Sequence, residues 1–128
     1  MEAETMRKYA ETHGFEIGNE QYVCPRPLPG IRDEHGEIRK QTVKRLFAKI
    51  DEELNELKQA IFVLYSLDAD AMQYSKVPEC AAEEIPREAA DTITAITTML
   101  EALGINAEMR DEAQRWVNEK NRKRGRLQ

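Results

Sequence analysis

The sequence predicts an all-α fold, in which a four-helix-bundle-type subunit pairs with a second copy to form a larger helical bundle. Composition is the first observation, because only 6% of the residues are aromatic, 41% are hydrophobic and 34% are charged. Strand formers are therefore scarce and helix formers abundant. Periodicity is the second, since apolar residues recur at three- and four-residue spacing over two long segments. A chain of 128 residues suits one domain, residues 1–128, with a modest core.

Four helices are expected, over residues 2–12, from 39–42 to about 66, from 86 to just before 104, and from 107 to about 123. Gly14 ends the first helix, Pro86 suits the first turn of the third, and Asn106 caps the fourth. The segment 15–38 has no period and holds several prolines and glycines, which predicts a loop with local turns. A second irregular stretch covers residues 67–84.

Nothing in the sequence indicates a membrane or secreted protein. The longest apolar run, Ala60–Tyr65, is far shorter than a membrane span, and the acidic N-terminus does not resemble a basic and apolar leader. Cys24 and Cys80 are lone thiols without the spacing of a metal site, which is typical of a reducing cytoplasm. The protein is therefore expected to be cytoplasmic, with no membrane partner.

Charge is distributed unevenly along the chain. The formal net charge is −5, but residues 120–128 carry five basic residues and no acid, so residues 1–119 sum to −10. An acidic body with a basic tail suits a protein that collects cations at one place and phosphates at another, although a solvated C-terminus has the same composition. A nucleic-acid partner is disfavoured, because the acidic body would repel the phosphate backbone.

The most informative residues are carboxylates on the apolar side of the second expected helix. Its apolar positions follow helical spacing: Leu46, Ile50, Leu54, Leu57, Ile61 and Leu64. At about 100° per residue, Glu53 falls inside the apolar arc, between Ala60 and Leu46. Glu56 lies at the margin of the arc, about 60° away. A carboxylate on this side must be protonated, paired or coordinated, since burying it alone costs several kcal/mol.

The third expected helix repeats this arrangement. Its apolar stripe comprises Ile85, Ala89, Ile93, Ile96, Met99, Leu100 and Leu103. Glu88 borders the stripe and Asp91 lies further along the same flank, so each helix places two carboxylates side by side at i, i+3 spacing. One such pair is common on a solvated face, but if the two helices pack antiparallel the four carboxylates converge and repel one another without a cation. Oxygen ligands with no nearby His or Cys favour Mg²⁺ or Mn²⁺ over zinc.

The fourth expected helix ends its apolar stripe in cations. Its inward-facing positions are Met109, Ala113, Trp116 and Val117. Lys120 continues the same line, Arg124 follows one turn later, and Asn121 lies beside them. Two interpretations fit this pattern. In the first, Lys120 and Arg124 donate hydrogen bonds to an anion held inside the bundle; in the second, both side chains extend to water or pair with surface acids.

Three sequence elements together resemble a known family. They are Glu52-Glu53-Leu54-Asn55-Glu56, Glu88-Ala89-Ala90-Asp91 and Lys120-Asn121-Arg122-Lys123-Arg124-Gly125. In this order they resemble the signature of the MazG-like branch of the all-α nucleoside triphosphate pyrophosphatases, over residues 39–126. The 31 residues between Glu56 and Glu88 exceed the family spacing, which leaves the nucleotide preference open.

The resemblance implies hydrolysis of a (deoxy)nucleoside triphosphate to the monophosphate and pyrophosphate, with Mg²⁺ as cofactor and Mn²⁺ as its substitute. The implied metal ligands are Glu53, Glu56, Glu88 and Asp91. Glu52 and Glu53 are the expected catalytic residues. Glu52 would orient a metal ligand or accept a proton from the attacking water, unless it is a surface acid. The substrate phosphates are assigned to Lys120, Asn121 and Arg124.

Apolar residues outside the main stripes predict an oligomer. On the second expected helix they are Phe47, Phe62, Val63 and Tyr65. Four helices of one short chain cannot cover these residues as well as the stripes, and a large uncovered patch is unusual on a monomer. A homodimer or homotetramer is therefore expected, as the resemblance also implies, and it would bring residues of a second subunit to the mouth of each metal site.

Two alternatives remain open. A related all-α pyrophosphatase that acts on dUTP or on phosphoribosyl-ATP would use a similar carboxylate cluster. A non-catalytic helical oligomerisation or regulatory module would bind a partner through its apolar faces and release no pyrophosphate.

Overall fold

The computed structural model describes residues 8, 10–14, 16–18, 23–67 and 83–126. The elements are β1 (Ile31–Arg32), β2 (Ile38–Arg39), α2 (Val43–Leu67), α3 (Glu84–Ala102) and α4 (Ala107–Lys123), with the side chains of α2 described as far as Phe62. Residues 8 and 10–12 are also helical, and Gly14 follows them in a turn with φ of +80°. The predicted helical character is confirmed for the described chain.

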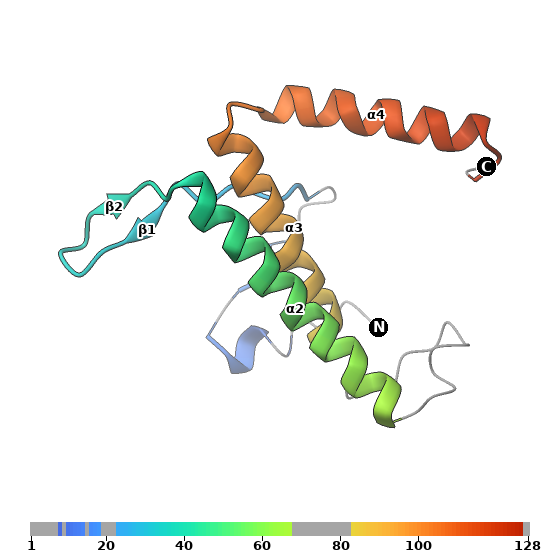
Figure 1. Cartoon of the computed structure of the whole chain (residues 1–128). Coiled ribbons are helices and arrows are strands. Elements are labelled where there is room, and N and C mark those ends of the chain that lie inside the picture. The colour runs from blue at the N-terminus through green and yellow to red at the C-terminus, as the bar shows by residue number, and fades with distance from the viewer. Residues whose placement is uncertain (1–7, 9, 15, 19–22, 68–82, 127–128) are drawn as a thin grey trace.

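The antiparallel pair of α2 and α3 forms the core, and the two helices lie side by side in the centre of Figure 1. Among the described side chains of α2, the buried ones are Leu46, Glu53 and Ala60, which follow one another at seven-residue spacing on one face. The predicted apolar arc of α2, with Glu53 inside it, is thereby confirmed. α3 buries only short side chains, namely Thr92, Ala95, Thr97 and Thr98.

One side-chain hydroxyl aligns α2 and α3 along their axes. The Thr92 hydroxyl lies 3.2 Å from the carbonyl oxygen of Glu53 and 2.9 Å from that of Glu88, so its proton is shared between α2 and its own helix. Thr92 is itself buried between the helices. The contact places Glu53 opposite the first turns of α3, where Glu88 lies.

The apolar stripe predicted for α3 is only partly buried. Ile93, Ile96 and Leu103 expose 50%, 40% and 50% of their surface, whereas the threonines beside them are buried. A buried threonine in a helix satisfies its hydroxyl by donating to the carbonyl four residues earlier, as Thr97 does to Ile93 at 2.8 Å. Short side chains with satisfied hydroxyls therefore pack inside, Ile85, Met99 and Leu100 are half-buried, and the other three large apolar residues stay at the surface.

An extended segment before β1 runs along the helix pair (Figure 1). The backbone amide of Leu28 donates to the Thr98 hydroxyl at 3.0 Å, which ties this segment to α3. At Gly30 an added Cβ would collide with the carbonyl group of Arg39, so the close approach of the two strands requires glycine there. The segment thus reaches the helices in a defined position, although its sequence has no period.

The hairpin of β1 and β2 corrects the expectation that residues 15–38 are irregular throughout. Its strands pair antiparallel, with Ile31 opposite Arg39. Asp33 holds the turn, because its carboxylate accepts from the amide of Glu37 at 2.9 Å and from Nε of Arg39 at 2.8 Å. Strands this short leave no apolar alternation to detect, and the bonds of one aspartate stabilise the hairpin.

α4 begins as predicted and then leaves the helix pair (Figure 1). Asn106 caps it, since its side-chain oxygen accepts from the amide of Met109 at 3.0 Å. Arg110 braces the preceding corner: its Nη1 atom donates to Oε2 of Glu101 at 2.6 Å and to the carbonyl oxygen of Ile105 at 2.7 Å. From this braced corner α4 extends away from α2 and α3.

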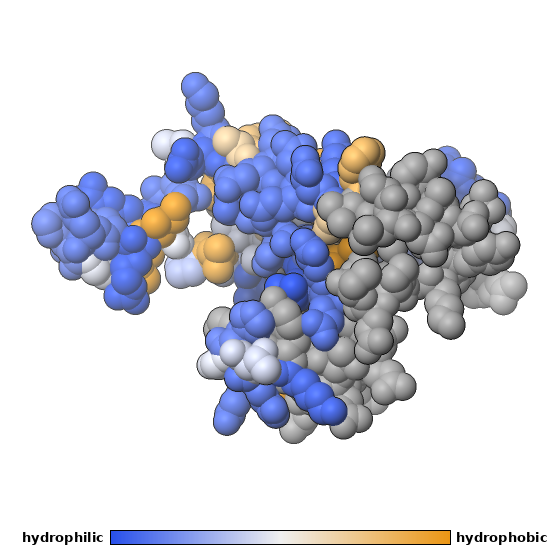
Figure 2. Space-filling model, turned by 90° about the horizontal axis from the view of Figure 1, so that it is seen from below, coloured by the Kyte–Doolittle hydropathy of each residue, from blue (hydrophilic) through white to orange (hydrophobic). Residues whose placement is uncertain are grey.

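The face of α4 that was predicted to lie inside the bundle is open in the single chain. Trp116 exposes 64% of its surface and Met109 51%, and no residue of α4 is buried. The expectation that this face packs within its own subunit is wrong for the described chain, because the corner at Arg110 directs the helix outward. Phe47 and Phe62 of α2 are exposed as well, and Figure 2 shows hydrophobic groups reaching the surface between hydrophilic ones.

Some of the residues used in the sequence interpretation lie outside the described part. These are residues 2–7, Cys80, most of the stretch 67–84, and the side chains of Val63 and Tyr65. Cys24 is described and is an exposed free thiol. Within the described ranges, no helix combines the length and the apolar character that crossing a membrane requires.

Ala60 provides a test of how α2 packs on α3. Ala60→Leu adds a branched alkyl group at a buried position, so we expect the free energy of unfolding to fall by about 1–3 kcal/mol. Lys58→Leu on the exposed side of the same helix is the control, and should change stability by less than about 0.5 kcal/mol. Urea unfolding followed by circular dichroism measures both. Equal effects would show that Ala60 is not enclosed.

Candidate functional site

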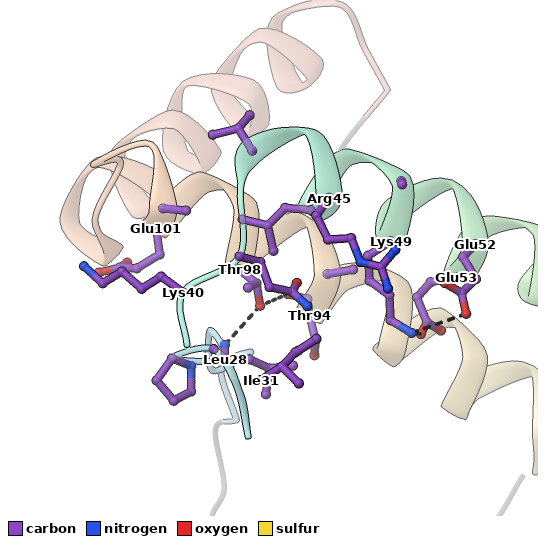
Figure 3. Close-up of a pocket in the computed structure, with 18 of the residues that line it drawn as sticks. Leu28, Ile31, Lys40, Arg45, Lys49, Glu52, Glu53, Thr94, Thr98 and Glu101 are labelled. Atoms are coloured by element: carbon purple, nitrogen blue, oxygen red, sulfur yellow. Dashed lines mark hydrogen bonds and ion pairs between the residues drawn. The ribbon is translucent and has the colours of Figure 1, made fainter. Parts of the chain in front are cut away.

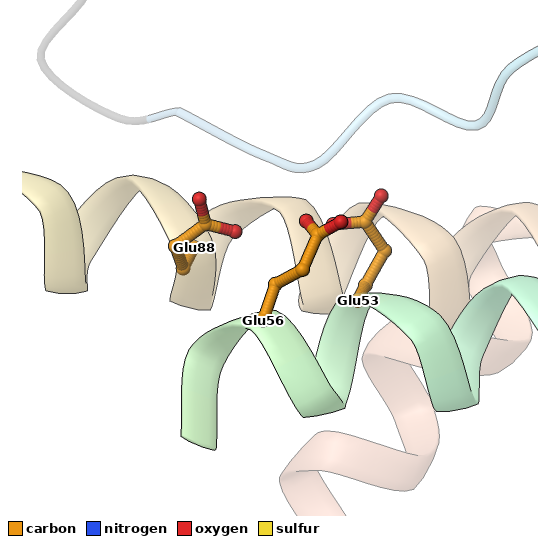
Figure 4. Close-up of side chains that lie close together, drawn as sticks. All are labelled: Glu53, Glu56 and Glu88. Carbon is orange, nitrogen blue, oxygen red and sulfur yellow. The ribbon is translucent and has the colours of Figure 1, made fainter. Parts of the chain in front are cut away.

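Three carboxylates converge between α2 and α3. Glu53 and Glu56 stand one turn apart on α2, and Glu88 comes from the first turns of α3 (Figure 4). One carboxylate oxygen from each lies within 4.8 Å of the other two. The i, i+3 spacing puts the two α2 groups on one side of the helix, and the Thr92 contact sets Glu88 against them. The structure therefore brings together three of the four carboxylates that were predicted to hold a metal.

The three carboxylates differ in burial: Glu53 is buried, Glu88 is half-buried and Glu56 is exposed. Glu53 is only 9% exposed. Its Oε1 atom pairs with the Lys49 ammonium at 3.0 Å, but its Oε2 atom and the Oε2 atom of Glu88 are buried and lack a hydrogen-bond partner among the described residues. Leaving a buried polar group unsatisfied costs about 1–3 kcal/mol, and more for a charged one. A cation held between the three carboxylates would remove this cost.

Neighbouring charge and burial raise the pKa of two carboxyls at the site. Repulsion by Glu53 is the largest cause of the raised pKa of Glu56. Partial burial raises the pKa of Asp91, and repulsion by Glu53 adds to it, while Arg87 and Lys49 act in the opposite direction. In both groups the charged carboxylate is disfavoured. A cation bound nearby would stabilise the charged form and lower both pKa values.

Asp91 and Glu52 flank the cluster without joining it. Asp91 lies about 60° around α3 from Glu88, as i, i+3 spacing requires, and its oxygens are not part of the group of three. Glu52 is exposed and shares Lys49 with Glu53, at 3.5 Å from the ammonium. Both Asp91 and Glu52 line an adjoining pocket. The predicted set of four ligands is thus reduced to three that converge and one that borders them.

A pocket of about 720 Å³ adjoins the carboxylates (Figure 3). α2 and α3 form its walls, and the chain around β1 closes one side with Leu28 and Ile31. Glu53 and Asp91 line it near the cluster, and Lys40 lines it beyond the N-terminal end of α2. Its size falls in the usual range of small-molecule sites, about 300–1,000 Å³. A ligand in this pocket would therefore touch both the carboxylates and the cations beyond them.

Two cations of this pocket on α2 were not identified from the sequence. Arg45 and Lys49 precede Glu53 by two turns and one turn of α2, so the three share a face of the helix. Their four-residue spacing was the available signal. Ordinary ion pairs on a helix surface have the same spacing. Only the position of the pocket therefore shows that these cations can reach a ligand.

The predicted phosphate-binding residues lie away from the cluster within one chain. Lys120, Asn121 and Arg124 belong to the end of α4 and line neither the carboxylate cluster nor the pocket. The Lys120 ammonium lies over the Trp116 ring, 4.9 Å from its centroid. A single chain does not place these residues beside the carboxylates, so their role stays a prediction that requires a second copy.

Comparison with known proteins adds no family to this picture. No protein-family model, no curated protein and no solved structure matches the chain. The likeness to MazG-like enzymes therefore consists of the three sequence elements alone.

The raised pKa of Glu56 predicts how stability depends on pH when a chelator removes divalent ions. Because the folded-state pKa lies above the ordinary value of 4.5, folding takes up protons between the two values, and stability falls as the pH rises through that window. Glu56→Gln should therefore raise the midpoint of thermal unfolding at neutral pH, but not at about pH 4, where the wild-type carboxyl is protonated.

Asp51→Asn is the control for this measurement, because Asp51 is an exposed acid of the same helix. It should give the same small change at both pH values. A Glu56→Gln protein that is less stable than the wild type at neutral pH in chelator would contradict the repulsion between Glu56 and Glu53.

Proposed function

We propose that this protein hydrolyses a nucleoside or deoxynucleoside triphosphate to the monophosphate and pyrophosphate, as the MazG-like enzymes that its sequence resembles do. One observation carries the proposal. Glu53, Glu56 and Glu88, which all belong to the family-like sequence elements, present oxygens within 4.8 Å of one another from two helices. Two oxygens of the group are buried and have no protein partner among the described residues, which favours a cation site over a structural cluster.

A hard divalent cation fits these donors. The three groups are all carboxylates, and sites built from oxygen donors suit Mg²⁺ or Mn²⁺ rather than zinc. The buried Oε2 atoms of Glu53 and Glu88 have lone pairs free for it. A bound ion would neutralise charge on the triphosphate and make a water molecule more acidic. Glu53, Glu56 and Glu88 would hold the ion, with Asp91 beside them.

The remaining acids suit the handling of the attacking water. Glu52 is exposed, lines the pocket and lies 3.5 Å from the Lys49 ammonium, so it can reach a water molecule held beside the cluster. In the proposed reaction the water oxygen attacks the α-phosphorus and the bond from that phosphorus to the α,β-bridging oxygen breaks. Glu52 takes a proton from the water, and pyrophosphate leaves. The proposed catalytic residues are thus Glu53, as a ligand of the ion, and Glu52, as the base.

A second copy of the chain would complete the site. The α4 face with Trp116 and Met109 is open, and so is the α3 stripe with Ile93 and Ile96. Each face offers half of a helix–helix contact. Docking α4 of one copy on the helix pair of another would cover both and carry residues 120–124 toward the carboxylates of the neighbour. We therefore propose a homodimer, or a homotetramer built from two such pairs.

The open apolar faces also support a second candidate, a non-catalytic helical module that binds a partner. Such a module would share the oligomeric state but has no use for carboxylate oxygens that are buried without a partner, so these oxygens of Glu53 and Glu88 favour the enzyme. With either function we propose a cytoplasmic location, which suits the exposed free thiol of Cys24.

Substrate profiling with pyrophosphate detection tests the proposed reaction. A panel of NTPs and dNTPs that includes dUTP, together with phosphoribosyl-ATP, is incubated with Mg²⁺, and the products are scored as pyrophosphate or phosphate. We expect pyrophosphate, with activity that stops in EDTA and returns with Mg²⁺ or Mn²⁺. Full activity in chelator, or phosphate as the product, would contradict the proposal.

Variants of the cluster serve as controls for the profiling. Glu53→Gln and Glu88→Gln should lower the rate by several orders of magnitude with unchanged helix content, because each removes a ligand charge. Mg²⁺ should raise the midpoint of thermal unfolding of the wild type and have a much smaller effect on these variants. Asp51→Asn, outside the site, should behave as the wild type in both measurements. A wild type that Mg²⁺ does not stabilise would favour the non-catalytic module.

Mixing two impaired variants tests whether a second copy contributes to the site. Glu53→Gln lacks a cluster ligand and Lys120→Ala lacks a phosphate contact, so each alone should turn over slowly. If Lys120 serves the neighbouring chain, half of the dimers in an equal, co-refolded mixture carry one intact site, which returns about a quarter of the wild-type rate.

Light scattering on the same samples should give at least twice 14.8 kDa at micromolar concentration. A mixture that recovers no activity while forming mixed dimers would show that Lys120 does not serve the neighbouring chain. A monomer with full activity would show that one chain contains the complete site.

A further inference from the structure

The pocket beside the carboxylate cluster changes charge along its length. Glu53 and Glu52 line it at the end nearest the cluster, and Lys49 and the Arg45 side chain follow. Lys40 and Glu101 line the far end (Figure 3). The first turn of α2 lies at this far end and carries no acid, so the partial positive charge of the helix terminus is not neutralised there. A ligand that fills the pocket therefore meets carboxylates first and cations further along.

Arg45 and Lys40 are both available cations of this pocket, and Arg45 is the one that lies nearer to Lys49. Glu101 lies near Lys40 in Figure 3, but its carboxylate is already paired with Arg110 at 2.6 Å. Arg45 forms no ion pair with a carboxylate of the described chain, and its side chain extends along the pocket in the direction of Lys49. A guanidinium offers a planar fork of donors that matches phosphate oxygens.

The spacing on α2 suits a chain of phosphates. Arg45, Lys49 and Glu53 follow one another in steps of four residues, which is about 6 Å per step along the helix axis. A phosphate chain that starts at the carboxylates and runs toward the N-terminus of α2 passes Lys49 and then reaches the Arg45 guanidinium. Lys49 now neutralises Glu53, and a cation in the cluster would compete for that carboxylate and leave the ammonium to the phosphates.

We propose that Arg45, together with Lys49, binds the β- and γ-phosphates of the substrate, so that the pocket receives the pyrophosphate leaving group. This inference rests on the proposed hydrolysis and gives the bound nucleotide a direction. The α-phosphate lies at the carboxylates, the nucleoside lies on the side of Glu56 and Glu88, and the pyrophosphate lies between α2 and the segment with Leu28.

Calorimetric titration with inorganic pyrophosphate tests this assignment without relying on turnover. The full-length wild type is titrated with pyrophosphate and with inorganic phosphate, once in chelator and once with excess Mg²⁺. We expect pyrophosphate to bind more tightly than phosphate. Arg45→Gln should raise the dissociation constant for pyrophosphate about tenfold, and Arg45→Lys should raise it less, because it keeps the charge and loses the fork.

Lys44→Gln is the matched control, because Lys44 is the adjacent exposed cation of α2 and does not line the pocket. It should leave pyrophosphate affinity within about twofold of the wild type. In turnover assays Arg45→Gln should also raise KM for the triphosphate, and raise the inhibition constant of pyrophosphate by a similar factor.

The outcomes separate this inference from the proposed function. Pyrophosphate affinity that is unchanged in Arg45→Gln, or reduced equally in Lys44→Gln, overturns the inference even if the protein hydrolyses nucleotides. A wild type that binds pyrophosphate in neither condition overturns it as well. If Arg45→Gln loses pyrophosphate binding and Lys44→Gln keeps it, the assignment of the pocket to pyrophosphate is supported. If the same preparations hydrolyse no triphosphate, only the proposed function fails.

Discussion

Glu53 cannot leave the interface of α2 and α3 without exposing the core. It lies between Leu46 and Ala60 in steps of seven residues, so any rotation of α2 that buries those two also buries the carboxylate. One of its oxygens is paired with Lys49 and the other has no partner in the described chain. The helix pair is therefore built around a group that the described chain satisfies only in part, and this unsatisfied oxygen is the link between the fold and the proposed function.

α3 accommodates the buried carboxylate with short side chains. Thr92 and Ala95 leave room for α2 to approach, and the Thr92 hydroxyl bonds the backbone of Glu53 itself. That register also decides the charge pattern, because it brings Glu88 to the two acids of α2 and leaves Asp91 on the wall of the pocket. The same packing leaves Ile93 and its apolar neighbours at the surface. The short side chains of α3 thus let α2 approach closely at the site, and the larger apolar side chains on the other side of α3 remain uncovered.

The site combines acids and cations. Three acids meet between α2 and α3, cations line the adjoining pocket toward the N-terminus of α2, and further cations lie on α4, some of them paired with acids of the same helix. A triphosphate with a divalent ion carries both kinds of charge, so it complements an arrangement of this type. The braced corner at Arg110 directs α4 outward, so its cations can act on a cluster only where two copies meet.

The sequence by itself determined the long helices, the Asn106 cap and the intrusion of Glu53 into an apolar face, because each depends on a local period or on a few adjacent residues. Tertiary structure decided which three of the four acids meet, where the pocket lies and which way α4 points. These features depend on the rotation and axial position of one element against another. They are set by contacts such as Thr92 with Glu53 and Leu28 with Thr98, whose partners are distant in the chain and carry no pattern that a period could reveal.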